Sequence, residues 1–353
     1  MRHVGGFVRH LRHQHDIVSR VRVRKSRDAA RQLVAEDISQ HRPSLCPHEP
    51  DIARATPRRR PISDHYEESR RLLGSCRIRE TGPLALSRHE TDSRIPGLDK
   101  KSGARALAAT LRATADLQAR LVAERRWGVL LVLQSMDAGG KDSTIRHVCR
   151  GIDPGGLRVA SFKAPSRDEM GEDFLRRTSQ ALPVRGEIGV FNRSYYEEVL
   201  ITRLHPELLA AEHLPQPELN DRIWHGRLED IAAHERYLDH QGILVRKVFL
   251  HISKDEQRRR FLRRLDRPDK VWKFDPADLA ERALWDKYVT AYEEAIAATA
   301  VDHAPWYVIP ADHKWVARLL VATLLRTTLE ALDPQYPPPG KGVKDARQKL
   351  EEE

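Results

Sequence analysis

The chain has 353 residues, of which 40% are hydrophobic and 32% are charged, and its mean hydropathy is −0.59. This length accommodates one large α/β domain with an extension, or two domains, and no apolar run approaches the roughly 18 residues that a membrane-spanning helix needs. The net charge of +10 indicates a polyanionic partner. Charged residues interrupt the N-terminus too often for a secretory signal, and the three cysteines have no metal-ligand spacing. Both observations fit a reducing cytoplasm.

The first 71 residues differ in composition from the rest of the chain. They are rich in arginine and histidine and poor in aromatic residues. Because such a segment buries too little apolar surface to offset its ordering entropy, we predict a disordered basic extension over residues 1–71. A nucleic-acid-binding arm is the alternative, but aromatic residues interleaved with the basic ones are lacking. The folded domain is expected over residues 72–333, and the proline-rich tail 334–353 is expected to be extended and disordered.

The domain opens with a predicted helix, strand and glycine turn. Apolar residues recur at helical spacing over residues 100–126. The unbroken apolar run 129–133 is typical of a strand buried on both faces, as in a parallel sheet. The turn 138–140 follows, and Lys141 introduces a helix over residues 142–149. Such a corner directs backbone N–H groups and the positive end of a helix dipole at one point, which suits a phosphate.

This corner is close to the P-loop pattern G-x-x-x-x-G-K-S/T. Ser135 stands where the first glycine belongs, and Asp142 stands where the magnesium-binding hydroxyl belongs. An ordinary strand–turn–helix corner is the alternative. The buried strand before the turn, the helix after it and a candidate metal carboxylate, Asp137, favour the phosphate loop.

The rest of the domain alternates strands and helices. Further strands are predicted over residues 157–162, 187–192, 243–252 and 306–310. Helices are predicted over residues 166–182, 219–241, 276–300 and 315–332, and also after the capping-box serines Ser194 and Ser253. This alternation predicts a parallel sheet covered on both faces, with ligands at the carboxyl ends of the strands.

Charged and polar side chains gather in the loops at that edge of the predicted sheet. They are Asp137, Lys141, Lys163, Asn192, Arg193, Glu197, Glu198, Asp312, His313 and Lys314. Phosphoryl transfer needs positioning, cations and a divalent metal. Asp137 with Glu197 or Glu198 would hold Mg²⁺, and Lys141 with Arg193 would neutralise developing charge. Stabilisation of a helix N-terminus is the alternative role of the two glutamates.

An arginine-rich helix follows Ser253. At 100° per residue, Arg260, Arg264 and Arg267 share one stripe, while the apolar residues 261, 262 and 265 are expected to face the core. With Arg263, Lys270 and Lys273 nearby, this segment is interpreted as a basic lid over phosphates. A solvated charged helix is the alternative for any single arginine.

Six segments, in the same order, resemble the polyphosphate kinase 2 family: residues 133–148, 161–165, 191–199, 249–254, 269–274 and 310–315. The resemblance extends from about residue 76 to 336. It is strongest to the subgroup that takes both nucleoside mono- and diphosphates, because Phe191-Asn-Arg-Ser-Tyr-Tyr-Glu197 carries the F-N-R-S-x-Y-E pattern of that subgroup.

The resemblance implies a fold and an activity. The expected fold is a three-layer α/β/α sandwich with a five-stranded parallel sheet, P-loop kinase-like and related to thymidylate kinases, with a helical lid over about residues 254–275. The expected reaction moves a phosphoryl group between inorganic polyphosphate and adenine or guanine nucleotides, with Mg²⁺ or Mn²⁺ as cofactor. A cytoplasmic homo-oligomer, dimer or tetramer, is expected, with neither a membrane nor a nucleic acid as partner.

The resemblance also assigns site residues. Catalytic roles fall on Asp137, Lys141 and Arg193, and metal binding on Asp137 and Glu198. Substrate-binding roles fall on Gly140, Ser143, Thr144, Lys163, Asn192, Glu197, Arg203, Arg260, Arg263, Arg264 and Lys273. Gly139 and Ser135 depart from the alanine that is commoner in this loop, and we do not expect that to abolish activity. The alternatives are an ATP-dependent nucleoside monophosphate kinase and a nucleic-acid-binding protein.

Overall fold

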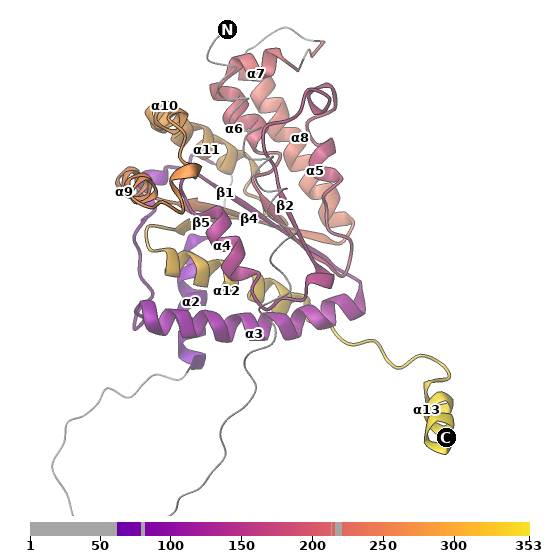
Figure 1. Cartoon of the computed structure of the whole chain (residues 1–353). Coiled ribbons are helices and arrows are strands. Elements are labelled where there is room, and N and C mark those ends of the chain that lie inside the picture. Colours follow the sequence, from indigo (N-terminus) through magenta and orange to yellow (C-terminus); the bar gives the residue numbers. More distant parts are fainter. Residues whose placement is uncertain (1–61, 79–81, 213, 216–220) are drawn as a thin grey trace, which may run out of the picture. The chain divides into compact units, whose positions relative to one another are not determined.

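The computed structural model describes residues 62–78, 82–212, 214–215 and 221–353. The basic extension predicted before residue 62 lies outside the described residues. From Ile62 onward the chain forms one unit, built around a central sheet (Figure 1). No helix within these ranges is long and apolar enough to cross a membrane.

The central sheet has five parallel strands in the order β2-β3-β1-β4-β5. The strands are β1 (Gly128–Ser135), β2 (Leu157–Ser161), β3 (Ile188–Asn192), β4 (Ile243–His251) and β5 (Trp306–Pro310). Every residue of β1 is buried, as its unbroken apolar run predicts for a central strand covered on both faces. The predicted five-stranded parallel sheet is therefore confirmed.

Helices cover both faces of the sheet (Figure 1). One layer contains α2 (Ile62–Cys76), α3 (Lys100–Glu124), α4 (Lys141–Val148) and α12 (Lys314–Leu332). The other contains α6 (Glu197–Leu204), α8 (Asp221–His240) and α11 (Trp285–Thr299). Helix α12 is apolar on nearly all sides because α2, α3 and α4 pack against it. The three-layer α/β/α architecture is thus confirmed.

The remaining elements are short. They are η1 (Leu86–Arg88), η2 (Pro154–Gly156), η3 (Glu169–Gly171), α5 (Arg176–Ser179), α7 (Pro206–Ala210), α9 (Lys254–Leu265), η4 (Val271–Lys273), α10 (Ala277–Ala283) and α13 (Val343–Glu352). Helices α9 and η4 fall within the predicted lid, residues 254–275, and α10 follows it.

The folded unit begins earlier than predicted. Helix α2 buries Leu73 and Cys76, and its Tyr66 hydroxyl donates to Oε2 of Glu330 on α12 at 2.5 Å. The guanidinium of Arg326 lies 3.6 Å from the centroid of the Tyr66 ring. The prediction of disorder is therefore wrong for residues 62–71, because they belong to a helix that Tyr66, Leu73 and Cys76 anchor to the rest of the domain.

Three predicted elements differ in the structure. The helix predicted over 166–182 is reduced to η3 and α5, because the Asp173 side chain accepts a hydrogen bond from the Leu175 N–H and begins a new turn. The helix predicted over 276–300 is broken at Leu284 into α10 and α11. The tail predicted to be extended contains helix α13.

A buried polar network joins β4 to three neighbouring elements. The ammonium of Lys247, in the middle of β4, is fully buried, pairs with Glu235 of α8 and donates to the Thr299 carbonyl at 2.7 Å. It also donates to the Tyr196 hydroxyl at 3.2 Å, and Glu235 accepts from the hydroxyls of Tyr195 and Tyr196 at 2.9 and 3.0 Å. Each charged group therefore has several hydrogen-bond partners, as burial of an ion pair requires.

Candidate active site

The predicted phosphate loop, residues 136–140, connects the end of β1 to the start of α4. Gly140 is the N-cap residue of α4 with φ of 103°, and Ala138 also has a left-handed backbone with φ of 58°. The first helical hydrogen bond runs from the Thr144 N–H to the Gly140 carbonyl at 2.9 Å. The predicted strand–turn–helix corner is therefore present, with the N-terminus of α4 at the end of β1.

Lys141 folds back over this loop. Its Nζ atom donates to the Ser135 carbonyl at 2.9 Å and to the Ser135 hydroxyl at 3.0 Å. Burial, followed by the neighbouring charge of Arg193, lowers the pKa of Lys141, and the carboxylate of Glu197 opposes this shift. The ammonium is thus poorly solvated, which strengthens its attraction to an incoming phosphate.

Arg193 joins two of the predicted carboxylates. Its Nη1 atom is 3.2 Å from Oε2 of Glu197, and its Nη2 atom is 3.7 Å from Oδ1 of Asp137. The two carboxylates, Glu197 first, raise the pKa of Arg193. Arg193 has φ of 65°, a strained backbone conformation for a residue with a side chain, and strain of this kind concentrates at functional sites. The structure therefore brings Asp137, Arg193 and Glu197 together.

Other predicted residues of the corner contact one another. The Asn192 amide donates to Oδ1 of Asp142 at 2.7 Å, so the carboxylate at the P-loop hydroxyl position is held by β3. The Ser143 hydroxyl accepts from Nη2 of Arg318 at 2.6 Å, and Thr144 is buried. Asn192 and Ser143 thus line the start of α4.

The donor set suits a magnesium ion only in part. No group of three or more histidine, cysteine or acidic side chains in the described part of the chain is arranged to hold a metal. Mg²⁺ is usually held by one or two carboxylates with waters and substrate phosphates. The side chain of Asp137 is 40% exposed next to Arg193, so it keeps an open face for such an ion.

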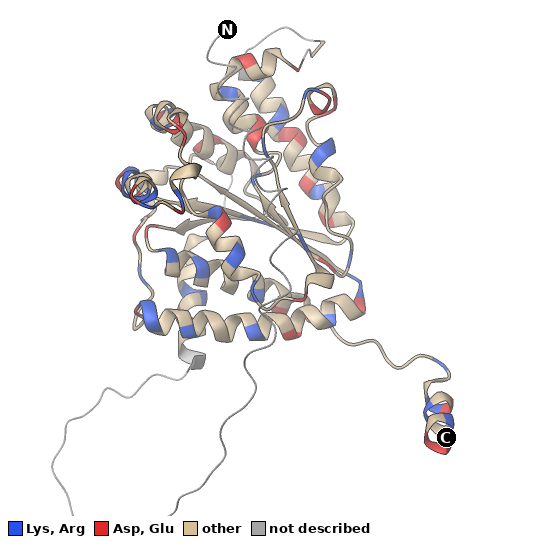
Figure 2. Cartoon of the chain, viewed as in Figure 1, with Lys and Arg blue, Asp and Glu red and all other residues tan. Residues whose placement is uncertain are grey.

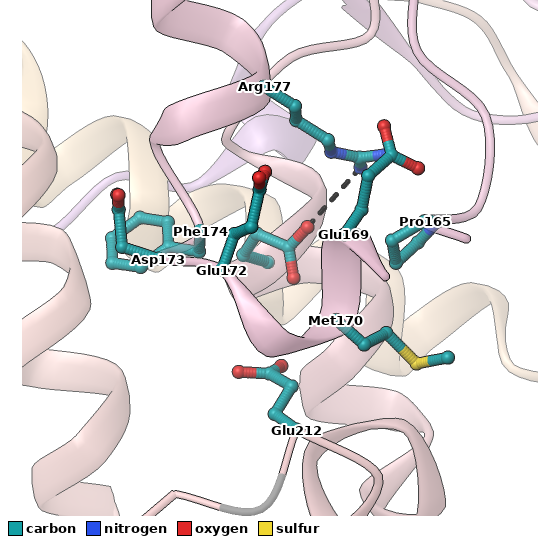
Figure 3. Close-up of a pocket in the computed structure, with 9 residues that line it drawn as sticks. Pro165, Glu169, Met170, Glu172, Asp173, Phe174, Arg177 and Glu212 are labelled. Carbon is teal, nitrogen blue, oxygen red and sulfur yellow. Dashed lines mark hydrogen bonds and ion pairs between the residues drawn. The ribbon is translucent and has the colours of Figure 1, made fainter. Parts of the chain in front are cut away.

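Glu198 has a different position from its neighbour Glu197. Its carboxylate lies 3.4 Å from Nη2 of Arg177 and 3.9 Å from Nη1 of Arg227, and burial raises its pKa. It lines a separate pocket together with Pro165, Glu169, Met170, Glu172, Asp173, Phe174, Arg177 and Glu212 (Figure 3). Glu197, rather than the predicted metal ligand Glu198, is therefore the glutamate beside Asp137 and Arg193.

The predicted orientation of the arginine-rich helix is wrong. Helix α9 carries many cations (Figure 2), but Arg260 is buried beside Phe261, whereas Leu262 and Leu265 are 48% and 42% exposed. Helical periodicity placed Arg260 outside with the other arginines. It lies inside because backbone carbonyls of distant loops accept hydrogen bonds from its guanidinium.

The three other cations that were predicted to bind substrate from this segment have partners in α9, η4 or α10. Nη2 of Arg263 is 3.1 Å from Oε1 of Glu256, but the Arg263 side chain remains 57% exposed. Nη1 of Arg264 is 3.3 Å from Oδ2 of Asp278, and it also donates to the carbonyl of Lys273. The Lys273 ammonium lies 5.0 Å from the centroid of a tryptophan ring. Of these three, Arg263 is the most accessible to a ligand.

Two predicted binding residues have other contacts. The guanidinium of Arg203, near the end of α6, pairs with Glu294 of α11. Lys163 is exposed, and its carbonyl accepts from Nη1 of Arg177 at 2.7 Å. Neither contact connects these residues to the phosphate loop.

Sequence reasoning placed Lys314 at this edge of the sheet but missed its proximity to α9 and to Arg318. Burial and the charges of Arg260 and Arg263 lower the pKa of Lys314 to about 8. Burial and the charges of Arg146 and Arg260 also lower the pKa of Arg318, one turn further along α12. The i, i+4 spacing of Lys314 and Arg318 was visible in the sequence, but their proximity to α9 was not.

A polar chain from α10 and α11 also reaches the site. The Tyr288 hydroxyl donates to Glu281 at 2.7 Å, and a ring nitrogen of His205 is 3.1 Å from the same carboxylate. Burial raises the pKa of Tyr288, with further contributions from Glu281, Asp137 and Glu197. No motif in the sequence pointed to these three residues.

Comparison with known proteins gives a consistent result. Residues 97–337 match the family model described as polyphosphate kinase 2. An ADP-polyphosphate phosphotransferase from Rhodopseudomonas palustris is 52% identical over 223 residues, covering 63% of this chain and 77% of the relative. An AMP/ADP-polyphosphate phosphotransferase from Meiothermus ruber is 46% identical over 265 residues, covering 74% and 95%.

Solved structures show the same similarity. The crystal structure of polyphosphate kinase 2 from Arthrobacter aurescens superimposes with a TM-score of 0.73 at 37% identity, covering 81% of this chain and 97% of that one. A second, described as a putative polyphosphate kinase 2 from Pseudomonas aeruginosa, has a TM-score of 0.60 at 30% identity, covering 66% and 48%.

Proposed function

Because this chain belongs to the polyphosphate kinase 2 family, we propose that it transfers a phosphoryl group between inorganic polyphosphate and AMP or ADP. The observation that carries the proposal is the meeting of Lys141 with the Asp137–Arg193–Glu197 cluster at the N-terminus of α4. Two relatives that share about half of their aligned residues with this chain are named for the same reaction.

The reaction needs no covalent enzyme intermediate. An oxygen of the terminal phosphate of the nucleotide attacks the end phosphorus of polyphosphate, and the bridging P–O bond of that phosphorus breaks. The bridging oxygen stays with the shortened polyphosphate, so the atoms balance. The enzyme contributes positioning and charge, which is how most phosphoryl transfer is catalysed.

The described side chains divide this work. Lys141 and the N–H groups at the start of α4 bind the transferring phosphate, and Arg193 neutralises charge on its equatorial oxygens. Asp137, with Glu197 beside it, would hold Mg²⁺ or Mn²⁺, which would supply further neutralisation of phosphate charge. Arg193 also orients both carboxylates.

The surplus of cations supports a long polyanion as the second substrate. Five cations on α4, α9 and α12 lie close enough together for their charges to lower the pKa values of Lys314 and Arg318. They are Arg146, Arg260, Arg263, Lys314 and Arg318. Mutual repulsion of this kind is relieved when a multiply charged anion binds. Polyphosphate has one charge for each phosphate and suits this surface.

The test compares phosphoryl donors. We expect purified protein with Mg²⁺ to convert AMP or ADP to its next phosphate when polyphosphate is the sole donor, and not when ATP is the sole donor to AMP. Transfer from ATP alone would instead identify an ATP-dependent nucleoside monophosphate kinase. Adenine and guanine nucleotides are assayed side by side.

The wider setting follows from the same proposal. We place the enzyme in the cytoplasm, where nucleotides are available, and a homo-oligomer of two or four chains stays a prediction.

A nucleic-acid-binding role for the basic N-terminal residues is tested by deleting residues 1–61. The enzyme should keep its activity, whereas a nucleic-acid-binding protein should lose its partner.

A further inference from the structure

Arg260 is buried at the base of the lid helix, and all five of its N–H groups have acceptors. Its side chain is 4% exposed. The acceptors are Oε1 of Glu256 for Nε at 2.9 Å, the carbonyls of Ala138 and Gly139 for Nη1 at 3.0 and 2.8 Å, and the carbonyls of Ala311 and Asp312 for Nη2, the latter at 3.3 Å.

This saturation matters because a guanidinium has five N–H donors and no more. A phosphate could hydrogen-bond to Arg260 only by displacing one of these acceptors. The neighbouring Arg263 contrasts with it, since its side chain is 57% exposed. The geometry therefore separates a cation that a ligand can reach from one that the protein uses internally.

The four carbonyls belong to two segments far apart in the sequence. Ala138 and Gly139 are in the phosphate loop, while Ala311 and Asp312 connect β5 to α12. The loop is also the place where Ala138 and Gly140 adopt left-handed backbone conformations. Such conformations persist only when surrounding contacts hold them. Arg260 supplies contacts of this kind directly behind the loop.

Gln257 strengthens the same connection. One turn before Arg260 on α9, its amide donates to the carbonyl of Asp137 at 3.0 Å. Two adjacent turns of α9 thus hold three consecutive carbonyls of the phosphate loop, those of residues 137–139. The first half of α9 is attached to the phosphate loop.

We propose that Arg260 is a positioning residue that fixes the conformation of the phosphate loop and ties it to the base of the lid, and that it is not a phosphate ligand. The expected effect of Arg260 on turnover rests on the proposed phosphotransferase function. Its effect on the conformation of the loop does not, because that conformation is present in the protein without substrate. Any lid movement must then occur beyond Arg260.

The first test is amide hydrogen exchange in the substrate-free protein. Arg260→Met removes all five donors, and Arg260→Lys keeps the charge but offers only three donors from one point. We expect exchange in residues 136–141 to become at least about tenfold faster in both variants, while β3 keeps its wild-type protection. Arg259→Ala is the matched control, because Arg259 pairs with the same Glu256 but is 61% exposed.

The exchange result can overturn the proposal. Wild-type protection of residues 136–141 in Arg260→Lys and Arg260→Met would show that the loop does not depend on this side chain. Equal acceleration in Arg259→Ala would show that only charge next to Glu256 matters. Should Arg260→Met fail to fold, Arg260→Lys decides, since it retains a cation in the same place.

The second test is kinetic. A displaced loop should lower kcat and raise KM for both polyphosphate and nucleotide, and Arg260→Lys should not restore them. A direct phosphate ligand would instead change KM for polyphosphate alone and be largely rescued by lysine, which would refute the proposal. If the wild-type protein fails to use polyphosphate, the proposed function is wrong, but the exchange experiment still reports on Arg260.

Discussion

Ser135 occupies the space that a side chain at Gly139 would need. A Cβ atom at position 139 would lie 2.4 Å from Oγ of Ser135 and 2.5 Å from its Cβ. The same hydroxyl accepts a hydrogen bond from Lys141 at 3.0 Å. The two residues are thus complementary, because the glycine leaves room for the serine that contacts the lysine.

Gly139→Ala should therefore impair the enzyme although the change is small. The added methyl group collides with Ser135 and with the Met136 carbonyl at 2.8 Å, so the loop must shift. We expect kcat/KM to fall by about 10- to 100-fold, because small displacements of positioning groups are costly. Adding Ser135→Gly should recover part of the loss relative to Gly139→Ala alone. Unchanged kinetics in the single variant would contradict this account.

Removing the charge of Lys141 or of Asp137 should abolish most phosphoryl transfer. We expect Lys141→Ala and Asp137→Ala each to lower kcat by about 10²-fold or more, since each removes electrostatic stabilisation of the transferring phosphate. Thermal stability should change little in Asp137→Ala, because the Asp137 side chain is 40% exposed. Asp302→Ala, at a carboxylate that is 95% exposed in a surface pair, is the control. Near-wild-type rates in either cluster variant would refute the site.

The two adjacent glutamates should give different phenotypes. Glu197→Gln should lower kcat and raise the Mg²⁺ concentration needed for half-maximal rate, because Glu197 orients Arg193 beside Asp137. Glu198→Gln should instead leave kcat and the Mg²⁺ requirement at their wild-type values, because the Glu198 carboxylate contacts Arg177 and Arg227 rather than Arg193. Metal titrations of both variants measure the difference. A Mg²⁺ phenotype confined to Glu198→Gln would reverse the assignment.

Binding of polyphosphate should weaken as the pH rises through about 8. Burial and the charges of Arg260 and Arg263 lower the pKa of Lys314 to about 8, so its ammonium loses its proton above that pH and no longer attracts phosphate. KM for polyphosphate should therefore rise between pH 7.5 and about 9. In Lys314→Arg the rise should disappear, because arginine stays charged. In Lys314→Gln, KM for polyphosphate should be high at every pH. If this variant kept the wild-type dependence of KM on pH, Lys314 would not be the group whose proton loss weakens binding.

The N-terminal boundary can be tested by truncation. Deleting residues 1–61 should leave the free energy of unfolding unchanged, whereas deletion through Cys76 should lower it, because α2 packs on α12. Leu73→Ala in the full chain should cost about 2–4 kcal/mol, as expected for a buried leucine. Urea unfolding measures each case. Full stability after deletion through Cys76 would show that α2 is dispensable.

The sequence predicted the parts of the site that depend on strand ends. Asp137 and Arg193 follow β1 and β3, which pair in parallel, so their loops had to emerge at the same edge of the sheet. It could not distinguish Glu197 from Glu198. Successive residues at a helix start point in directions about 100° apart, and only the positions of Arg177 and Arg227 show which one faces away from Asp137.

Arg260 shows a second limit of sequence reasoning. Periodicity assumes that arginines lie outside and leucines inside, which holds when polar groups have no partners in the core. Here the partners are backbone carbonyls of residues 138, 139 and 312, which any sequence would provide. For the same reason, the apolar face of α2 was missed, since its few apolar residues matter only where α12 is present to cover them.

The buried Lys247 has a consequence for how β4 aligns with its neighbours. In the sheet, Lys247 is paired with Val132 of β1, whose strand ends in the phosphate loop, while β4 continues into α9. If β4 slid by one residue, its side chains would exchange faces, and the ammonium would be separated from Glu235. An error of alignment between β1 and β4 would therefore leave a buried charge without solvent or partner, and the chain is protected against that misfolded arrangement.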